Sequence, residues 1–374
     1  MTTVDDCLIL GGGVIGLSLA LELSRRGRRV RVLDRTHTRR PAAWAAGGMI
    51  PSADPARSHN AFERLRGISH AMYPDWIAKI ERDAGIDTEF RRNGAIHLAC
   101  GRGEAAALRA NIAQLRDEGL QVECIDMYAL LQLEPALEPL VERGGVQVAY
   151  LLAEEASVRT PRYLQALRAA CRRQGVAICD EVDVHRFHCH DQRVSHVCSE
   201  NEKWSAESFC IAAGTWSGQL LQLLGLTLEL HPWRGQMVLF RGPVGLLSRT
   251  INVGPNYLVP RLDGRIIVGS TMEEVGFDDR TTSEEIERLI TFARQHVPLL
   301  EQAEVEATWA GLRPGTGDGY PFLGRVPGTQ NVFAATGHFR NGIQLAPGTA
   351  LVMAQLIEGD VPQVPLEMFR LDRE

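Results

Sequence analysis

The sequence predicts an α/β fold, α+β overall, in which a domain built on a parallel sheet is interleaved with a domain built on an antiparallel sheet. Two observations predict this division. Strand and helix patterns alternate from the N-terminus to about residue 214, which is typical of parallel sheets. From residue 230 onward, short apolar strands are separated by turn residues, which is typical of antiparallel sheets. The length of 374 residues favours two domains, or one domain with a large insertion.

The chain opens with a βαβ unit. Residues 7–10 form a short apolar strand, and residues 14–26 carry the apolar spacing of a helix that Gly27 ends. A second strand follows and ends at Asp34, 21 positions after Gly13. This arrangement predicts a Rossmann-like domain.

Glycines between the first strand and the first helix complete the pattern Gly11-x-Gly13-x-x-Gly16. Backbone N–H groups and the positive end of the helix dipole can bind a pyrophosphate at such a turn. The carboxylate of Asp34 is then placed to accept hydrogen bonds from ribose hydroxyls. The N-terminal unit therefore predicts a dinucleotide-binding site.

The middle of the chain continues the alternation. Helical spacing covers residues 59–84, 104–118 and 161–174, and Thr160 before Pro161 is predicted as the N-cap of the last of these helices. Strand-like runs cover residues 94–99, 145–151, 177–187, 193–198 and 209–214. The antiparallel part is predicted to hold strands at 236–240, 256–260 and 265–269, with helices following at 282–296 and about 343–357.

Charge and hydropathy argue against several kinds of partner. The net charge of -6 gives no support for nucleic acid or an anionic membrane. The apolar run at residues 7–23 lacks the positive flank and the cleavage site of a signal peptide. No stretch approaches the ~20 apolar residues of a membrane span, so we expect a soluble, cytoplasmic protein.

Histidines and cysteines gather around the turn Asp191-Gln192-Arg193, and none of the eight cysteines forms a CxxC pair. The clustered residues are His185, His188, Cys189, His190, His196 and Cys198. On two hairpin strands, alternate positions face opposite sides, and the spacing matches no tetrahedral zinc pattern. We therefore predict no metal site and reduced thiols.

Motifs spread over the whole chain identify a family resemblance. They are residues 11–16, Ala45-Ala46-Gly47-Gly48-Met49, residues 212–217, Arg234-Gly235-Gln236-Met237, residues 257–261, residues 268–272, Gly311-Leu312-Arg313-Pro314-Gly315-Thr316 and Gly337-His338-Phe339-Arg340-Asn341-Gly342. In these the sequence resembles the D-amino acid oxidase family of FAD-dependent oxidoreductases, and most closely the glycine oxidases of thiamine biosynthesis. The resemblance implies an FAD-binding domain at residues 1–90, 155–220 and 305–374, and a substrate-binding domain at 91–154 and 221–304.

The resemblance implies FAD as the cofactor. Residues matching Asp34 and Arg35 hold the adenosine in the family, and the small residues near Gly47 line the flavin. The last helix is expected to direct its positive end at the flavin, where negative charge develops on reduction. The implied FAD contacts are Gly11, Gly13, Val14, Ile15, Gly16, Asp34, Arg35, Ala42, Ala43, Gly47, Gly48, Met49, Val182, Gly214, Arg313, His338, Phe339, Arg340, Asn341, Gly342, Ile343 and Gln344. The sarcosine oxidase branch of the family tethers its flavin through a cysteine near the C-terminal region, whereas the last cysteine here is Cys210, so the resemblance implies non-covalent FAD.

A bidentate arginine recognises a substrate carboxylate best. The resemblance gives this role to Arg340, with Arg313 assisting and Tyr257 adding a hydroxyl, while Met49 and Met272 wall the pocket. Structural alternatives remain open: Arg313 could anchor a loop, Tyr257 could be a core residue, and both methionines could serve packing alone. No acid–base residue is assigned, because hydride transfer to flavin requires mainly that the donor carbon be positioned.

The implied reaction oxidises glycine, or a small N-substituted or D-amino acid, to an imine and then a 2-oxo acid and ammonia, while oxygen becomes hydrogen peroxide. The alternatives are a dehydrogenase of the same family that passes electrons to another carrier, and a flavin-binding subunit without catalysis. A nicotinamide-dependent dehydrogenase ranks third. Relatives in the family also imply a homo-oligomer. The segment Pro41-Ala42-Ala43 lacks the hydroxyl side chains common in relatives, and Pro255-Asn256 leaves the shape of the substrate pocket open.

Overall fold

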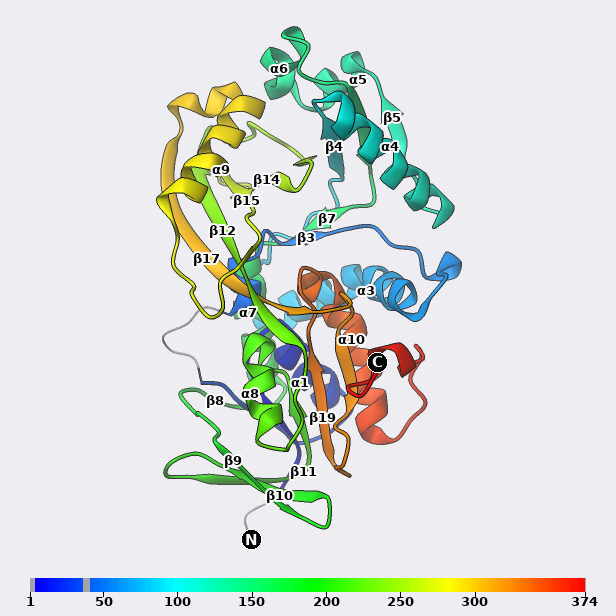
Figure 1. Cartoon of the computed structure of the whole chain (residues 1–374), viewed down its shortest axis with the longest axis vertical. Helices are drawn as coiled ribbons and strands as arrows, with labels where there is room; N and C mark the ends of the chain where they lie inside the picture. The colour runs from blue at the N-terminus through cyan, green and yellow to red at the C-terminus, as the bar shows by residue number, and fades with distance from the viewer. Residues whose placement is uncertain (1–3, 36–40, 374) are drawn as a thin grey trace.

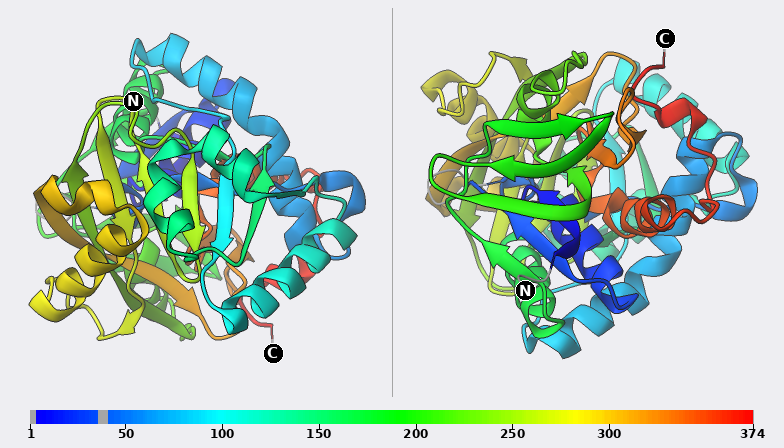
Figure 2. Two further views of the ribbon diagram at one scale, coloured as in Figure 1. Left: turned by 90° about the horizontal axis from the view of Figure 1, so that it is seen from above. Right: turned by 90° about the horizontal axis from the view of Figure 1, so that it is seen from below.

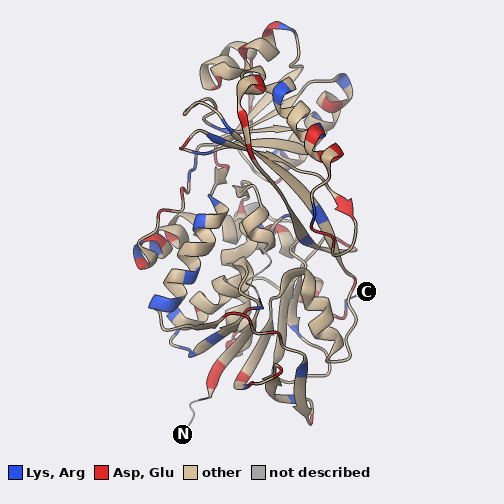
Figure 3. Cartoon of the chain, turned by 90° about the vertical axis from the view of Figure 1, so that its left-hand side faces the viewer, with Lys and Arg blue, Asp and Glu red and all other residues tan. Residues whose placement is uncertain are grey.

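A computed structural model describes residues 4–35 and 41–373 and confirms the predicted mixed α/β fold. Residues 1–3, 36–40 and 374, which the predicted first domain includes, lie outside the described residues. Figure 1 shows one sheet with its helices in the lower half of the molecule and a second, largely antiparallel sheet in the upper half. Basic and acidic residues are interspersed along the ribbon in both halves (Figure 3).

The first sheet has the order β18–β19–β11–β1–β2–β8. Its strands are β18 (Phe322–Arg325), β19 (Val332–Thr336), β11 (Lys203–Ile211), β1 (Asp5–Leu10), β2 (Val30–Leu33) and β8 (Ala177–Cys179). All neighbours from β19 to β8 pair in parallel, and β18 is antiparallel to β19. Because the termini supply β1 and β19 to one sheet, segments more than 300 residues apart meet at its carboxyl edge.

Helices cover one face of this sheet. They are α1 (Val14–Arg25), α3 (Ala61–Ala84), α7 (Thr160–Arg173) and α10 (Gly342–Glu358), which pack on one another. Cys7 and Ile9 of β1 point into this helical core, whereas Leu8 and Leu10 point to the opposite face. A parallel strand buried on both faces explains why the sequence of β1 is continuously apolar.

The opposite face is covered near the N-terminus by an antiparallel hairpin of β9 (Arg186–His190) and β10 (Arg193–Cys198), which extends β11. Figure 2, seen from below, shows this green hairpin at the end of the molecule that carries the N-terminus. The short helix α8 (Ser217–Gln222) packs on β11. Asp191 and Gln192 adopt positive φ angles of 48° and 63°, which confirms the predicted turn.

The second sheet has the order β16–β12–β15–β14–β13–β4–β6–β5, with β17 paired to β12. Its strands are β16 (Glu273–Glu274), β12 (Leu230–Arg241), β15 (Arg265–Gly269), β14 (Asn256–Pro260), β13 (Thr250–Val253), β4 (Ala95–Ala99), β6 (Val148–Leu152), β5 (Glu123–Ile125) and β17 (Glu304–Thr316). Helices α4 (Arg102–Asp117), α5 (Met127–Leu133), α6 (Glu138–Glu142) and α9 (Ser283–His296) belong to the same half. The parallel pairing of β13 with β4 joins two separate parts of the sequence.

Several predicted boundaries differ from the structure. The single strand expected at 177–187 is two strands, β8 and β9, because the intervening backbone bonds outside the ladder: the Val182 N–H donates to the Asp34 carbonyl. The strand expected at 209–214 begins at Lys203 and ends at Ile211. Pairing with β12 places residues 304–316 in the second sheet, although the predicted division assigned residues from 305 onward to the first domain.

The N-cap expected at Thr160 is wrong. Arg159 is the N-cap residue, and Thr160 begins the helix. The Thr160 hydroxyl instead donates to the Ala46 carbonyl at 3.0 Å, so it ties α7 to a neighbouring loop. In the part of the chain that the structure describes, no helix is both long enough and apolar enough to cross a membrane.

Candidate active site

One cavity of about 410 Å³ lies at the carboxyl ends of β1, β2, β11 and β19. This edge of a parallel sheet is where open α/β folds bind ligands. The cavity brings the first turn of the chain together with the start of the last helix. Predicted residues that line it are Gly11, Gly13, Val14, Ile15, Asp34, Arg35, Ala42, Ala43, Gly47, Gly48, Met49, Val182, Gly214, Tyr257, Arg313, His338, Phe339, Arg340, Gly342 and Ile343.

The turn after β1 requires glycine at two positions for packing. A Cβ atom at Gly11, where φ is 120°, would lie 2.4 Å from the Ala212 carbonyl oxygen. A Cβ atom at Gly16 would lie 2.0 Å from the Gly11 carbonyl oxygen. A Cβ atom at Gly13 would meet no atom within 4 Å, so this glycine leaves open space at the start of α1. The helix N-terminus therefore faces a space that an anionic group can enter.

Asp34 is buried at the end of β2 and lines the same end of the cavity. Its Oδ2 atom accepts a hydrogen bond from Arg168 Nη2 at 3.2 Å, and Arg168 Nη1 also bonds both oxygens of Asp180. The Arg35 guanidinium stacks over the Trp216 ring, 4.6 Å from its centroid. These contacts hold a carboxylate and a flat aromatic surface next to each other.

The loop from α2 (Ala42–Ala45) to β3 (Met49–Ile50) forms another wall. Trp309 Nε1 donates to the Ala45 carbonyl at 3.0 Å, and Arg261 Nη2 donates to the Gly47 carbonyl at 2.7 Å. Arg261 is 5% exposed, and burial lowers its pKa to about 10. Because Trp309 lies in β17 and Arg261 directly follows β14, the second sheet holds this wall in place.

Two guanidiniums face the cavity from different elements. Arg313 on β17 donates from Nη2 to Ser270 Oγ at 2.8 Å and from Nη1 to the Thr271 carbonyl at 3.2 Å. A Cβ atom at Gly235 would lie 2.1 Å from Arg313 Nη2, so the guanidinium rests directly on that glycine. Burial lowers the pKa of Arg313, and the nearby positive charge of Arg340 acts in the same direction.

Neither guanidinium is neutralised by the protein. Over the described ranges 4–35 and 41–373, neither Arg313 nor Arg340 forms an ion pair with a carboxylate. Arg340 is exposed, whereas Arg313 is half-buried. The Tyr257 hydroxyl lies nearby and donates to the Met237 thioether at 3.7 Å, a weak acceptor. Two positive charges and a hydroxyl therefore converge without an anionic partner.

The turn before α10 is held in a specific conformation. Phe339 has a positive φ of 47°, and its N–H donates to the Pro314 carbonyl at 2.9 Å. His338 is fully buried, its Nε2 lies 3.1 Å from Thr349 Oγ1, and burial lowers its pKa to about 3. A neutral His338 therefore supports the turn that carries Arg340 and the N-terminus of α10.

Four predicted site residues do not line the cavity: Gly16, Met272, Asn341 and Gln344. Gly16 serves the close packing described above, and Asn341 is the N-cap residue of α10. Gln344 Nε2 donates to the Pro51 carbonyl at 2.8 Å. Met272 is 56% exposed.

The sequence reasoning missed several lining residues, including His185, Trp216, Gln219, Leu220, Leu223, Gly235 and Ser270. Trp216, Gly235 and Ser270 fall within the quoted motifs, so the motifs contained a signal for them. The others carry no recognisable pattern, because α8 and the segment before β9 reach the cavity only through tertiary packing.

The comparisons with known proteins identify the family. The model of the FAD-dependent oxidoreductase family matches residues 6–356. The chain belongs to this family. It is 34% identical over 356 residues to the glycine oxidase of Pseudomonas putida, with 95% of each chain covered. Its structure is similar to the crystal structure of glycine oxidase from Geobacillus kaustophilus, with a TM-score of 0.92 and 31% identity over 100% of both chains.

A further relative is the Bifunctional protein ThiO/ThiG of a Synechocystis species. The two are 33% identical over 366 residues, which cover 96% of this chain and 52% of the relative. The predicted resemblance is confirmed, and the chain is a glycine oxidase-like oxidoreductase.

The residues of the cavity fit the FAD of this family. The open space at Gly13 and the carboxylate of Asp34 suit a pyrophosphate and a ribose. Thr215 lines the cavity, and its buried hydroxyl has no hydrogen-bond partner among the residues that the structure describes, as expected of a group that bonds a ligand. The small residues of the Gly47 loop allow the backbone to approach a flat ring closely.

Proposed function

We propose that this protein oxidises glycine, or a small N-substituted or D-amino acid, with non-covalently bound FAD. The imine hydrolyses to a 2-oxo acid and ammonia, or to a 2-oxo acid and an amine where the substrate nitrogen is substituted, and oxygen is reduced to hydrogen peroxide. The observation that carries this proposal is the pair of unneutralised guanidiniums, Arg313 and Arg340, at the cavity. A cation that is partly removed from water, as the half-buried Arg313 is, is costly without a counter-ion, and a substrate carboxylate supplies one.

Arg313, Arg340 and Tyr257 are placed for different contacts with the substrate carboxylate. Ser270 and the Thr271 carbonyl orient the Arg313 guanidinium, so little side-chain freedom remains to be lost on binding. Arg340 approaches from the turn before α10 and is exposed, so it suits a second contact made as the substrate enters. The Tyr257 hydroxyl can turn from the weak Met237 acceptor to a carboxylate oxygen. In this division Arg313 takes the principal role that the sequence resemblance gave to Arg340.

The remaining residues hold the walls of the cavity in place and add no further positive charge beside the two arginines. FAD supplies the hydride acceptor when it is bound. Arg261 and Trp309 hold the Gly47 loop, and Phe339 and His338 hold the start of α10. His338 stays neutral because of its burial, so it adds no positive charge beside the arginines. None of these residues is assigned a role in proton transfer.

Other parts of the proposal have separate support. None of the cysteines in the described chain lines the cavity, which supports non-covalent FAD. The relative named ThiO/ThiG supports a role in thiamine biosynthesis. A cytoplasmic homo-oligomer that uses molecular oxygen completes the proposal.

An anaerobic reduction panel tests the proposal. The purified flavoprotein is mixed without oxygen with glycine, sarcosine, D-alanine, D-proline and bulkier N-substituted glycines, and the loss of flavin absorbance is followed. Reduction by at least one of them, followed by rapid reoxidation in air with release of hydrogen peroxide, is the expected result. Slow reoxidation in air would favour the dehydrogenase, and no reduction by any compound would favour a subunit without catalysis.

A further inference from the structure

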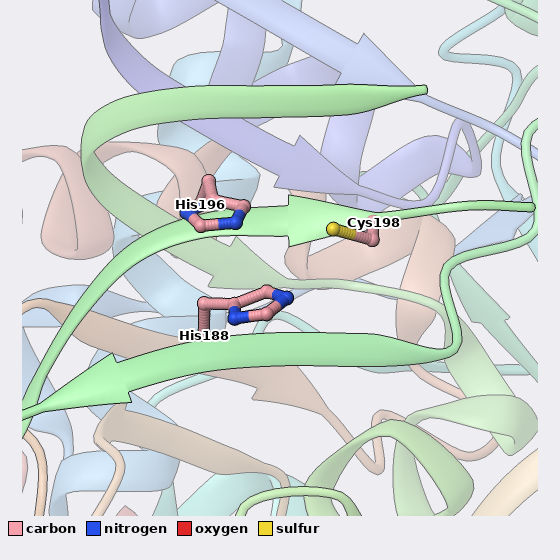
Figure 4. Close-up of side chains that lie close together, drawn as sticks. All are labelled: His188, His196 and Cys198. Atoms are coloured by element: carbon pink, nitrogen blue, oxygen red, sulfur yellow. The ribbon is translucent and has the colours of Figure 1, made fainter. Parts of the chain in front are cut away.

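The hairpin of β9 and β10 places three potential metal ligands on one face. His188 on β9 lies directly opposite His196 on β10, and Cys198 follows two residues later on the same strand. One ligand atom from each residue lies within 4.8 Å of the other two (Figure 4). All three side chains are half-buried, and none of them lines the cavity described above.

A β-bulge creates this grouping. The pairing register shifts between Val194 and His196, so Ser195 is an extra residue in β10. As a result, Val194 and Val197, three positions apart, are both buried in the core. Without the bulge, Ser195 would lie opposite His188, and His196 and Cys198 would face the other side of the hairpin, together with Val194. The prediction of no metal site rested on strict alternation and on the spacing of the ligands in the sequence, and the bulge removes the first of these two grounds.

The bulged residue also orients a ligand. Ser195 Oγ lies 3.2 Å from the His188 carbonyl oxygen and 2.9 Å from His196 Nδ1. If the hydroxyl donates to the carbonyl, it accepts from Nδ1–H, which leaves the Nε2 lone pair of His196 free. Metal-bound histidines commonly have their second nitrogen held in this way. The two imidazole rings are stacked, with centroids 4.1 Å apart and planes inclined by 13°.

The donor set selects the kind of ion. Two imidazole nitrogens and one thiolate sulfur suit Zn²⁺ and similar ions, whereas Mg²⁺ and Ca²⁺ require oxygen ligands. No carboxylate belongs to this group among the described residues. The cross-strand neighbours of Cys198 are Arg186 and Lys203, which offer no ligand oxygen.

We infer that His188, His196 and Cys198 bind a Zn²⁺-type ion, with water in the fourth position on the open side of the hairpin. Ligand atoms around Zn²⁺ lie roughly 3.3–3.8 Å apart, so small side-chain rotations bring the three into place. Binding replaces the Cys198 thiol proton, which is released to solvent. The site also adjoins the cavity wall, because the His185 N–H donates to the Cys198 carbonyl at 3.1 Å.

The test measures Zn²⁺ binding by calorimetry with untagged flavoprotein that has been treated with a chelator and then freed of it. The expected result is one tight site per chain. Cys198→Ser, His188→Gln and His196→Gln should each weaken that site about tenfold or more, and Ser195→Ala should weaken it roughly 10- to 100-fold. Co²⁺ provides a second probe, because tetrahedral thiolate ligation gives intense absorption that Cys198→Ser abolishes.

Matched controls come from the same strand. Cys189→Ser and His190→Gln change exposed residues of β9 that lie outside the group, and they should leave Zn²⁺ affinity unchanged. Bound flavin and circular dichroism verify that every variant is folded. Equal losses in the control and ligand variants, or unchanged binding in all three ligand variants, would overturn the inference. A Co²⁺ complex that lacks thiolate absorption would overturn it as well.

Discussion

Replacing Arg313 with methionine tests which guanidinium anchors the substrate. The substitution keeps much of the side-chain length but removes the donors that Ser270 and the Thr271 carbonyl orient. Hydrogen bonds to a charged group contribute about 1.5–3 kcal/mol, and each ~1.4 kcal/mol is a factor of ten, so the apparent Kd for substrate should rise about 10- to 150-fold. Arg340→Met removes an exposed charge, for which solvent screening leaves an effect of only a few-fold.

The assay is anaerobic stopped-flow reduction of the bound flavin over a range of substrate concentrations. It separates the apparent Kd from the limiting rate of reduction. The FAD content of both variants should match that of the unsubstituted protein, because neither change touches the pyrophosphate or ribose end of the cavity. A larger rise in apparent Kd for Arg340→Met than for Arg313→Met would refute the argument from burial.

Two further predictions concern the cofactor end and acid stability. Asp34→Ala should weaken FAD binding about 10- to 150-fold in a titration of apoprotein, whereas Asp180→Ala, which removes the other partner of Arg168 outside the cavity, should not. Burial lowers the pKa of His338 to about 3 from its ordinary 6.5, so between these values the unfolded chain binds one more proton than the folded protein. The free energy of unfolding should therefore fall as the pH falls through this window, by about 2 kcal/mol from this residue between pH 7 and 5. Urea unfolding at both pH values should show that His338→Gln removes that part of the loss, and an unchanged pH dependence in the variant would contradict it.

The sequence predicted the parts of the fold that depend on local pattern. The glycine turn, Asp34 and the apolar runs of β1 and α1 each carry their own signal, and all of them appear where they were expected. The motif at residues 337–342 was likewise expected beside that turn, and the two line one cavity. These features were predictable because a short stretch of sequence determines each of them.

Features set by distant contacts could not be predicted in this way. The break between β8 and β9 depends on a bond from Val182 to the Asp34 carbonyl, and the Thr160 hydroxyl bonds a loop more than a hundred residues away. The bulge at Ser195 places His196 opposite His188 on the same side of the hairpin, and no local pattern in the sequence predicts this bulge. The relative burial of Arg313 and Arg340 is also a tertiary property, since it depends on Gly235 and Ser270 from other strands.

The proposed function requires a substrate carboxylate as the counter-ion of Arg313 and Arg340. The most direct measurement compares anaerobic flavin reduction by the best amino acid of the panel with reduction by its carboxamide, which keeps the amine and the reacting carbon but lacks the negative charge. We expect the acid to reduce the flavin efficiently, and we expect the apparent Kd for the amide to be higher by about tenfold or more. Equal reduction by the two compounds would contradict it.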